Sequence, residues 1–259
     1  MLLAIDVGNT HTVIGLYSSP ASDELVDHWR ISTNDERTSD ECALMVQEFL
    51  AFHGHGLRSG IHGVAISSVV PRVSMALREM TVKYFGFEPV VVGPGIRTGM
   101  PILTDNPKEV GADRIVNSIA AFAQFGGPAI VIDFGTATTF DAVSAKGEYL
   151  GGAIVPGIEI SLEALTSRAA ALRRVELVEP RNVIGKNTVE SIQSGVIFGY
   201  AGLVDGLCER MEHELGKSVI VATGGLATLI SPYCDSIEHI EPWLTLHGLR
   251  IIYERNTKA

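Results

Sequence analysis

The sequence contains few cysteines, and their placement argues against two kinds of site. Cys42, Cys208 and Cys234 are the 3 cysteines among 259 residues, and none belongs to a C-x-x-C pair. A disulfide framework uses an even set of cysteines, and a structural zinc site uses paired thiolates or a Cys/His pattern. The 8 histidines form no H-E-x-x-H motif, and His53 and His55 flank a glycine in an expected loop. We therefore expect neither disulfides nor a histidine-bound metal.

Positive charge is also scarce. The chain has 20 Lys and Arg against 30 Asp and Glu, which gives a formal net charge of −10 at pH 7. Proteins that bind the phosphate backbone of nucleic acids use a surplus of cations to displace counterions. The charge balance therefore argues against a nucleic-acid partner. An anionic small-molecule substrate is still compatible with it, provided that local groups hold that substrate.

Long apolar runs are missing as well. No apolar stretch approaches the roughly 18 residues that a membrane-spanning helix needs. The N-terminal residues 1–6 lack both the basic region and the cleavage site of a signal peptide. These absences predict a cytoplasmic protein without a membrane partner.

Three common nucleotide-binding signatures are not found. Gly185-Lys186-Asn187 lacks the hydroxyl residue and the first glycine of a phosphate-binding P-loop. Gly93, Gly95 and Gly99 follow an expected strand, but their spacing differs from G-x-G-x-x-G. Asp133-Phe134-Gly135 matches three letters of the protein-kinase set, but no catalytic loop precedes it. If the chain binds ATP, it does so through another motif.

An internal repeat is present. Residues 6–12 read D-V-G-N-T-H-T and residues 133–139 read D-F-G-T-A-T-T, at an offset of 127 residues. Each segment follows a short β-branched run and leads into a second strand-like run. Two such matches, separated by about half of the chain, indicate a duplicated unit. Because 46% of the residues are apolar, both halves can form a packed core, and we predict two domains, 1–127 and 128–259.

Hydrophobic periodicity predicts the element order βββαβαβα in each half. In the first half we expect strands near 2–6, 12–17, 25–31, 63–68 and 89–92, and helices near 39–52, 72–85 and 107–126. In the second half we expect strands near 129–133, 138–144, 147–154, 218–222 and 236–240, and helices near 158–172, 188–215, 225–231 and 243–255. Ser39 is the expected N-cap of the first helix. Strands separated by helices pair in parallel, so the fold class is α/β, with mixed sheets and an interdomain cleft for a ligand.

The two glycine-bearing turns suit a polyphosphate ligand. Gly8 and Gly135 would let backbone N–H groups approach phosphate oxygens without a Cβ in the way. Asp6 and Asp133 could hold a cation, directly or through water, that neutralises phosphate charge. Side chains that could donate further hydrogen bonds are Asn9, Thr10, Thr12, Thr136, Thr138 and Thr139. The alternative is a pair of ordinary hairpin turns in which Asp and Asn satisfy local amides.

Two further segments are candidates for ligand binding. Thr223-Gly224-Gly225 follows an expected strand, and such a junction brings a helix N-terminus to a ligand such as adenosine. The alternative is close packing of a helix on a strand. Gly111-Ala112-Asp113-Arg114 lies near the start of a helix, where the helix dipole favours an acidic residue for structural reasons alone. The functional interpretation is an acceptor carboxylate beside a guanidinium that grips an anionic substrate.

Together these segments resemble the type III pantothenate kinases. The matching segments run along the whole chain: Asp6–Thr10, Asn106–Val110, Gly111–Arg114, Asp133–Thr139, Gly151–Gly157, Thr223–Gly225 and Leu244–Arg250. D-x-G-N-T alone is shared by the wider actin, Hsp70 and sugar-kinase superfamily, whereas its combination with G-A-D-R and D-F-G-T-A-T-T is far more specific. The resemblance implies two duplicated domains of the actin-like ATPase (ribonuclease H-like) type. It also implies ATP-dependent phosphorylation of the primary hydroxyl of pantothenate, the first step towards coenzyme A.

The resemblance also implies roles for particular residues. The ATP-binding residues would be Asp6, Val7, Gly8, Asn9, Thr10, His11, Thr12, Val13, Gly135, Thr136, Thr223, Gly224 and Gly225. The pantothenate-binding residues would be Gly111, Ala112, Asp113, Arg114 and Thr188, with Asp113 as the catalytic proton acceptor. Asp133 would bind a monovalent cation, K⁺ or NH₄⁺, and Asp6 could reach Mg²⁺ through ATP. The implied assembly is a homodimer with the substrate site near the subunit interface.

Two other functions stay open. Another kinase of the same superfamily, acting on a sugar or a carboxylate, would keep both hairpins but has no reason to combine G-A-D-R with Lys186-Asn187-Thr188. A non-catalytic nucleotide-binding regulator would tolerate the loss of Asp113. Met100-Pro101, which follows Gly99, departs from the pattern expected for the family and leaves the shape of that loop open.

Overall fold

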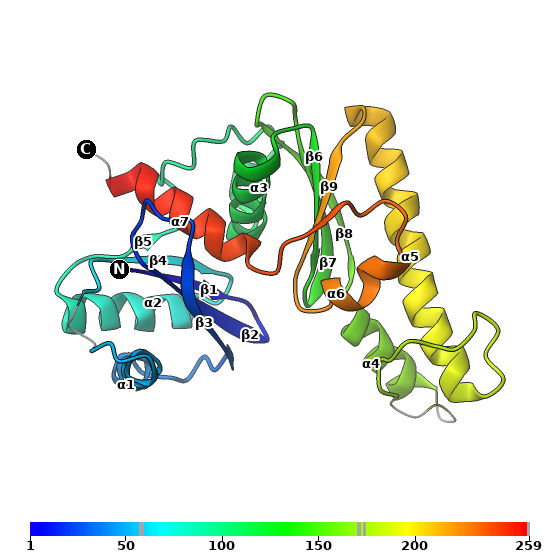
Figure 1. Ribbon diagram of the computed structural model, residues 1–259, viewed down its shortest axis with the longest axis horizontal. Coiled ribbons are helices and arrows are strands. Elements are labelled where there is room, and N and C mark those ends of the chain that lie inside the picture. Colours follow the sequence, from blue (N-terminus) through cyan, green and yellow to red (C-terminus); the bar gives the residue numbers. More distant parts are fainter. Residues whose placement is uncertain (57–59, 170–171, 173–174, 258–259) are drawn as a thin grey trace. The chain divides into compact units, whose positions relative to one another are not determined.

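The computed structural model describes residues 1–56, 60–169, 172 and 175–257. The chain divides into two compact units, and each contains a five-stranded mixed sheet (Figure 1). The first unit comprises Met1–Pro101, Asp105–Ala120 and Trp243–Ala259, and the second comprises Ile102–Thr104 and Ala121–Pro242.

The sheet of the first unit has the strand order β3-β2-β1-β4-β5. Its strands are β1 (Leu2–Val7), β2 (His11–Tyr17), β3 (Leu25–Ser32), β4 (Gly63–Ser68) and β5 (Val90–Val91). β1, β2 and β3 form an antiparallel meander, whereas β4 pairs in parallel with β1 and β5. Leu3, Ile5 and Val7 pack in one core with α1 (Ser39–Phe52) and α2 (Pro71–Met80). α7 (Leu244–Thr257) contacts β1 and β4, and Figure 1 shows it on the opposite side of the sheet from α1 and α2.

The sheet of the second unit has the order β10-β9-β6-β7-β8, which is the same topology. Its strands are β6 (Ala129–Phe134), β7 (Ala137–Val143), β8 (Tyr149–Pro156), β9 (Val219–Thr223) and β10 (His239–Ile240). Ile130, Ile132 and Phe134 pack in a core with α4 (Ile158–Arg168), α5 (Thr188–Leu215) and α6 (Ala227–Ile230). The predicted α/β class, with an antiparallel meander followed by parallel strands in each half, is therefore confirmed.

The two first hairpins differ by one residue, which the aligned letters did not reveal. Val7 pairs with Thr12, but Phe134 pairs with Thr138, so the second hairpin is shorter by one residue. From the second strand onward the offset is thus 126 and not 127, and the β-bulge after Leu16 recurs after Ala142 at that offset. The repeat is real, but the loop lengths within it are not equal.

Several predicted element boundaries are corrected by the structure. Thr38, and not Ser39, caps α1, because its side chain accepts a hydrogen bond from the Glu41 amide while the Glu41 carboxylate accepts one from the Thr38 amide. The predicted helix from 107 is a short 3₁₀ turn, Pro107–Glu109, followed by α3 (Ala112–Phe125), because Val110 is extended. The two predicted helices near 158–172 and 188–215 are both present, as α4 and α5, so the order βββαβαβα understates this connection by one helix. Positions 170 and 171, at the predicted end of α4, lie outside the described residues.

The compact units and the predicted domains 1–127 and 128–259 differ in the placement of α7. Leu244, Leu246, Leu249 and Ile252 of this helix are buried, and the helix packs on β1 and β4 of the first unit. The division at 127/128 stays a prediction about the duplicated segments and does not describe how the chain packs.

The structure describes the state of the cysteines and the apolar character of the helices. Cys42, Cys208 and Cys234 are free thiols, as expected. Among the described residues, no helix combines the length and the apolar character needed to cross a membrane.

Candidate active site

The first glycine-bearing turn is a tight loop between β1 and β2. The Gly8 amide donates a 2.9 Å hydrogen bond to the His11 carbonyl, and a Cβ on Gly8 would lie 3.1 Å from that oxygen. Asn9, Thr10 and His11 are exposed, whereas the side chains of Val7 and Thr12 are buried. The exposed part of the predicted phosphate segment is therefore its tip, where backbone amides and short polar side chains face solvent.

Thr33, at the end of β3, holds this loop and was not among the predicted site residues. Its hydroxyl donates to the Gly8 carbonyl at 2.7 Å, and its amide donates to the Thr10 carbonyl at 2.9 Å. The Thr33 hydroxyl also lies 3.0 Å from the hydroxyl of Thr12. The Thr12 side chain is thus engaged within the first unit. Only the strand register brings Thr33 to the loop, so no local sequence signal could have identified it.

Asp6 lies where the parallel strands β1 and β4 end. It is half-buried and pairs in register with Ser67, whose side chain is fully buried. The hydroxyl of Ser68 donates to the Val70 carbonyl at 3.0 Å and accepts from the Val70 amide at 3.1 Å, which closes the turn into α2. Ser67 and Ser68 therefore lie beside the first hairpin, although sequence reasoning did not select them.

The G-A-D-R segment forms the start of α3. Asp113 is the second residue of the helix, is half-buried, and accepts a 2.8 Å hydrogen bond from the Arg114 amide. A Cβ on Gly111 would lie 2.5 Å from Asp113 Oδ1, so a side chain at Gly111 would force the carboxylate to move. A carboxylate in the first helical turn is stabilised by the helix dipole. The arrangement places a half-buried carboxylate at the start of a helix.

The second hairpin and the T-G-G junction meet in the second unit. Asp133 ends β6 and pairs in register with Thr139 of β7 and with Thr223 of β9. Gly224 has φ +93°, and a Cβ there would lie 2.5 Å from Asp133 Oδ1 and 2.6 Å from the Phe134 amide nitrogen. The backbone of the junction therefore passes directly over the Asp133 carboxylate, which only glycine allows.

Gly157 brings a helix N-terminus to the same hairpin. A Cβ on Gly157 would collide with the carbonyl oxygen of Thr136 and would lie 2.6 Å from that of Gly135. α4 begins directly after Gly157, and no side chain caps its N-terminus. Free amides at a helix start attract anions, so the exposed Gly135–Thr136 turn and the start of α4 form a surface suited to phosphate. Gly157 belongs to the G-G-A-I-V-P-G segment, to which sequence reasoning assigned no role.

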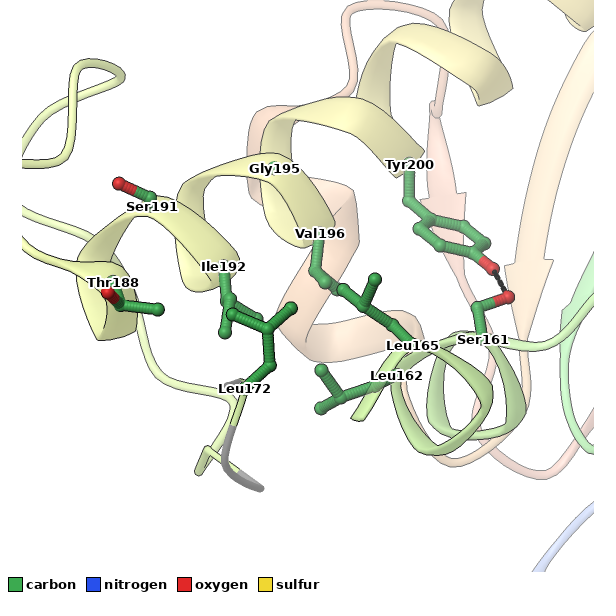
Figure 2. Close-up of a pocket in the computed structure, with 10 residues that line it drawn as sticks. All are labelled: Ser161, Leu162, Leu165, Leu172, Thr188, Ser191, Ile192, Gly195, Val196 and Tyr200. Carbon is green, nitrogen blue, oxygen red and sulfur yellow. Dashed lines mark hydrogen bonds between the residues drawn. The ribbon is translucent and has the colours of Figure 1, made fainter. Parts of the chain in front are cut away.

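Thr188 lines a separate cavity between α4 and α5 (Figure 2). The cavity has a volume of about 380 Å³, and its apolar lining residues are Leu162, Leu165, Leu172, Ile192 and Val196. Hydroxyl groups come from Ser161, Thr188, Ser191 and Tyr200. The Ser161 and Tyr200 hydroxyls lie 2.6 Å apart, and Tyr200 also donates to the Pro156 carbonyl at 2.8 Å. An apolar pocket with a few hydroxyls suits a small organic ligand.

The predicted site residues therefore fall into two sets. The first unit contains Asp6–Val13 and Gly111–Arg114, and the second contains Asp133, Gly135, Thr136, Thr188 and Thr223–Gly225. Within the second unit, Asp133, Gly135 and Thr136 lie together with Gly224, whereas Thr188 belongs to the cavity between α4 and α5.

Comparison with known proteins identifies the family. The family model described as type III pantothenate kinase matches residues 2–210 of the chain. The chain belongs to the type III pantothenate kinase family. A relative of that name from Streptomyces coelicolor is 56% identical over 264 aligned residues, which cover 99% of this chain and 98% of the relative. A type III pantothenate kinase from Moorella thermoacetica is 55% identical over 258 aligned residues, which cover 99% of this chain and 100% of the relative.

Solved structures show that the fold of this type III pantothenate kinase family member is shared more widely. A putative Baf family transcriptional activator from Campylobacter jejuni has a TM-score of 0.59 at 19% identity, with 98% of both chains covered. A ROK family glucokinase from Streptomyces griseus, solved with glucose and AMPPNP, has a TM-score of 0.54 at 12% identity, covering 98% of this chain and 99% of that one. At these identities the likeness concerns the fold alone, and that fold is the actin-like ATPase fold of sugar kinases.

Proposed function

We propose that this chain transfers the γ-phosphoryl group of ATP to the primary hydroxyl of pantothenate, which gives 4′-phosphopantothenate, the first step towards coenzyme A. The observation that carries the proposal is the full-length match, at 56% identity, to a relative named type III pantothenate kinase. The reaction uses ATP from the cytoplasm, and we place the enzyme there.

Asp113 is the proposed catalytic base. A carboxylate is far less basic than an alkoxide, so Asp113 does not ionise the substrate hydroxyl in advance. The transition state of phosphoryl transfer is loose, so the base needs only to orient the hydroxyl and to accept its proton late. The position of Asp113 in the first turn of α3 and its hydrogen bond from the Arg114 amide support this role, because both hold the carboxylate in place at the start of the helix.

Each glycine-bearing turn is a proposed contact for the phosphates of ATP. Support comes from the exposed tip Asn9–His11 in the first unit, and from the exposed Gly135–Thr136 turn beside the start of α4 in the second. Backbone amides in such turns bind phosphate oxygens without adding net charge, which suits a chain of net charge −10. The Thr223–Gly225 junction is the proposed contact for adenosine.

The donor groups around Asp133 fit a monovalent cation. The Asp133 carboxylate has hydroxyl-bearing residues on both neighbouring strands, Thr139 and Thr223, and oxygen ligands of this kind suit hard cations. We propose that Asp133 holds K⁺ or NH₄⁺ and that Asp6 faces the Mg²⁺ carried by ATP. Such cations would neutralise the phosphate charge that builds up during transfer.

The proposed contacts for pantothenate are Gly111–Arg114 and Thr188, which lines the cavity between α4 and α5. The guanidinium of Arg114 suits the substrate carboxylate, and the apolar lining of the cavity suits its dimethyl group.

A homodimer is proposed because many of the exposed apolar side chains belong to residues 150–189 of the second unit. β8 is an edge strand of its sheet, and Ile154 on it is 61% exposed. Further exposed apolar residues of the same stretch are Leu150, Ile160, Leu165, Val178, Val183, Ile184 and Val189. Exposed apolar groups at a sheet edge mark an interaction surface, and a second copy of the chain is the proposed occupant.

The proposed function is tested by ADP release, measured with and without pantothenate. We expect release that depends on pantothenate, with stoichiometric formation of the phosphate ester. Release that depends on glucose or another sugar would show a sugar kinase and would contradict the proposal. Nucleotide binding without turnover on any substrate would show a non-catalytic regulator.

A further inference from the structure

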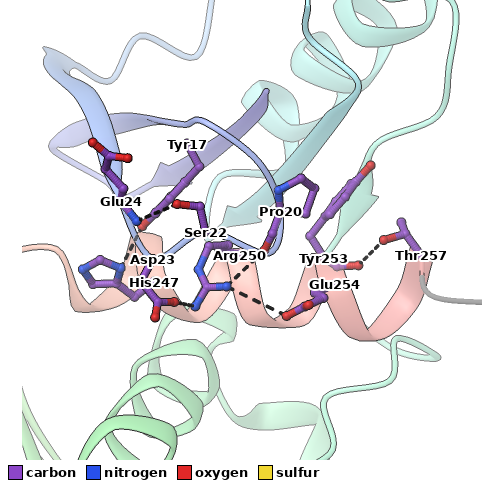
Figure 3. A network of polar contacts seen from close by, with 10 residues as sticks. All are labelled: Tyr17, Pro20, Ser22, Asp23, Glu24, His247, Arg250, Tyr253, Glu254 and Thr257. Atoms are coloured by element: carbon purple, nitrogen blue, oxygen red, sulfur yellow. Dashed lines mark hydrogen bonds and ion pairs between the residues drawn. The ribbon is translucent and has the colours of Figure 1, made fainter.

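α7 is fixed to the first unit by polar contacts along its length, several of them partly buried (Figure 3). The Arg250 side chain is 8% exposed, donates to the Pro20 carbonyl at 3.0 Å, and forms an ion pair with Asp23. One turn further on, the Tyr253 hydroxyl donates to the His62 carbonyl at 3.1 Å. Because these contacts reach separate loops, they fix the position of the helix on the sheet.

The last turn of α7 holds the loop that precedes Met100-Pro101. The Asn256 side chain accepts from the Arg97 amide at 3.0 Å and donates to the Arg97 carbonyl at 3.0 Å. Arg255 donates from its guanidinium to the Thr98 carbonyl. The side chains of Arg255 and Asn256 therefore form hydrogen bonds with the backbone of Thr98 and Arg97. These bonds replace those that a neighbouring strand would make.

The chain turns under the Arg255 side chain. Gly99 has φ +70°, and a Cβ on it would lie 2.6 Å from Arg255 Nη1. The Thr98 hydroxyl donates to the Met100 carbonyl at 3.1 Å, and the Met100 side chain is 6% exposed. The direction in which the chain leaves this loop is thus set by α7.

This loop begins the segment that ends at the G-A-D-R motif. Beyond Pro101, the Leu103 amide donates to the Tyr149 carbonyl at 2.8 Å, which ties the chain to the start of β8. The Asn106 side chain then accepts from the Lys108 amide at 3.3 Å and donates to Glu109 at 2.6 Å. The segment is therefore fixed at several points before it reaches Gly111, and the first of them is the contact with α7.

We propose that Asn256 and Arg255 are positioning residues for the substrate segment, acting through the backbone of Arg97 and Thr98. The proposal rests on the proposed function, since it concerns the pantothenate side of that site. Neither residue needs to touch substrate, because both act on the backbone of the segment that leads to Gly111–Arg114. Loss of these contacts with the backbone of Arg97 and Thr98 changes the binding of pantothenate and not that of ATP.

The test compares Asn256→Ala with Thr257→Ala. Thr257 lies in the same turn, and its hydroxyl bonds only within the helix, to the Tyr253 carbonyl. For Asn256→Ala we expect a rise of about tenfold in the KM for pantothenate, an unchanged KM for ATP, and faster hydrogen exchange of the Arg97 amide. Thr257→Ala should alter none of these. Asn256→Asp keeps the acceptor for the Arg97 amide, and should retain its protection from exchange in part.

Three outcomes separate the possibilities. Faster exchange at Arg97 with unchanged kinetics overturns the positioning role. An equal rise in the KM values for pantothenate and ATP, together with a lower melting temperature, shows a merely structural contact. That result also overturns the positioning role. Wild-type protein that releases no ADP with pantothenate contradicts the proposed function instead, and the exchange measurement still reports whether α7 holds the loop.

Discussion

Two of the carboxylates with a proposed role, Asp113 and Asp133, each have a glycine packed against them. A Cβ on Gly111 would lie 2.5 Å from Asp113 Oδ1, and a Cβ on Gly224 would lie 2.5 Å from Asp133 Oδ1. In both cases the bare backbone passes close to one oxygen of the carboxylate. At the residue scale, Gly111 and Gly224 therefore leave room for the neighbouring acids, apart from any contact that glycines of the family motifs make with phosphate.

Asp113→Asn should lower kcat by about 10²–10⁴, because general-base catalysis contributes a factor of that size. The amide keeps the size of the carboxylate, so the KM values for ATP and pantothenate should change little. Steady-state ADP release measures both constants. Asp35→Asn is a suitable control, because Asp35 is an exposed carboxylate before α1. Near-normal turnover of Asp113→Asn would remove this residue from the mechanism.

Replacing K⁺ and NH₄⁺ by Na⁺ should reduce activity to background, since the proposed site at Asp133 selects the larger cations. The measurement keeps Mg²⁺ and ionic strength constant and titrates K⁺ back into the Na⁺ buffer. Asp133→Asn should abolish the response to K⁺. Full activity in Na⁺ alone would refute the role given to Asp133.

At the scale of elements, sequence periodicity predicted most helices and strands, but the contacts that end them were harder to predict. Thr38 and Ser39 are adjacent hydroxyl residues, and either could cap α1 by composition. The deciding fact is the extended backbone of Thr38, with φ −75° and ψ 163°, which points its side chain at the Glu41 amide. Capping depends on the backbone angles at one residue, and a hydrophobic pattern does not report them.

Thr38→Ala should therefore lower the free energy of unfolding by about 1 kcal/mol, as the loss of an N-cap does. Urea denaturation of the two variants Thr38→Ala and Ser39→Ala provides the comparison. Ser39 is the first residue of the helix and is 8% exposed, and its replacement should cost less. A larger loss for Ser39→Ala would reverse the assignment of the cap.

The candidate site shows the same limit of sequence reasoning. The turns at Gly8 and Gly135 could be predicted because strand, glycine and hydroxyl residues are contiguous there. Thr33 and Ser67 could not be predicted, because they reach the first hairpin only through the pairing of β3 and β4 with their neighbours. Contacts that depend on strand register lie between segments far apart in the sequence.

At the scale of the whole molecule, the assignment of α7 to a unit could not be predicted. Its buried face would fit either sheet as judged by the sequence, because both sheets share one topology. Its partner is decided by specific fits, such as the close approach of Tyr253 to Gly63 and of Leu246 to Gly15. Such complementarity between distant residues is not encoded in a local pattern.

The proposed homodimer predicts the molecular mass of the protein in solution. Static light scattering should give about twice the 27.7 kDa of one chain. Ile154→Asp should shift the species towards the monomer, because it places a charge on the exposed edge strand β8. Leu44→Asp, at a 63% exposed position of α1 in the first unit, should leave the mass unchanged. A monomeric wild-type protein would contradict the homodimer.

The placement of α7 also has a consequence for synthesis on the ribosome. The second unit is complete once Pro242 has been made, whereas the first unit still lacks the helix that covers one face of its sheet. The chain is synthesised from its N-terminus, so Leu2–Ser68 is made before the second unit and α7 is made after it. α7 can therefore pack on β1 and β4 only after the second unit has been synthesised. The face of β1 and β4 that α7 covers therefore lacks its helix until the residues after Pro242 have been made.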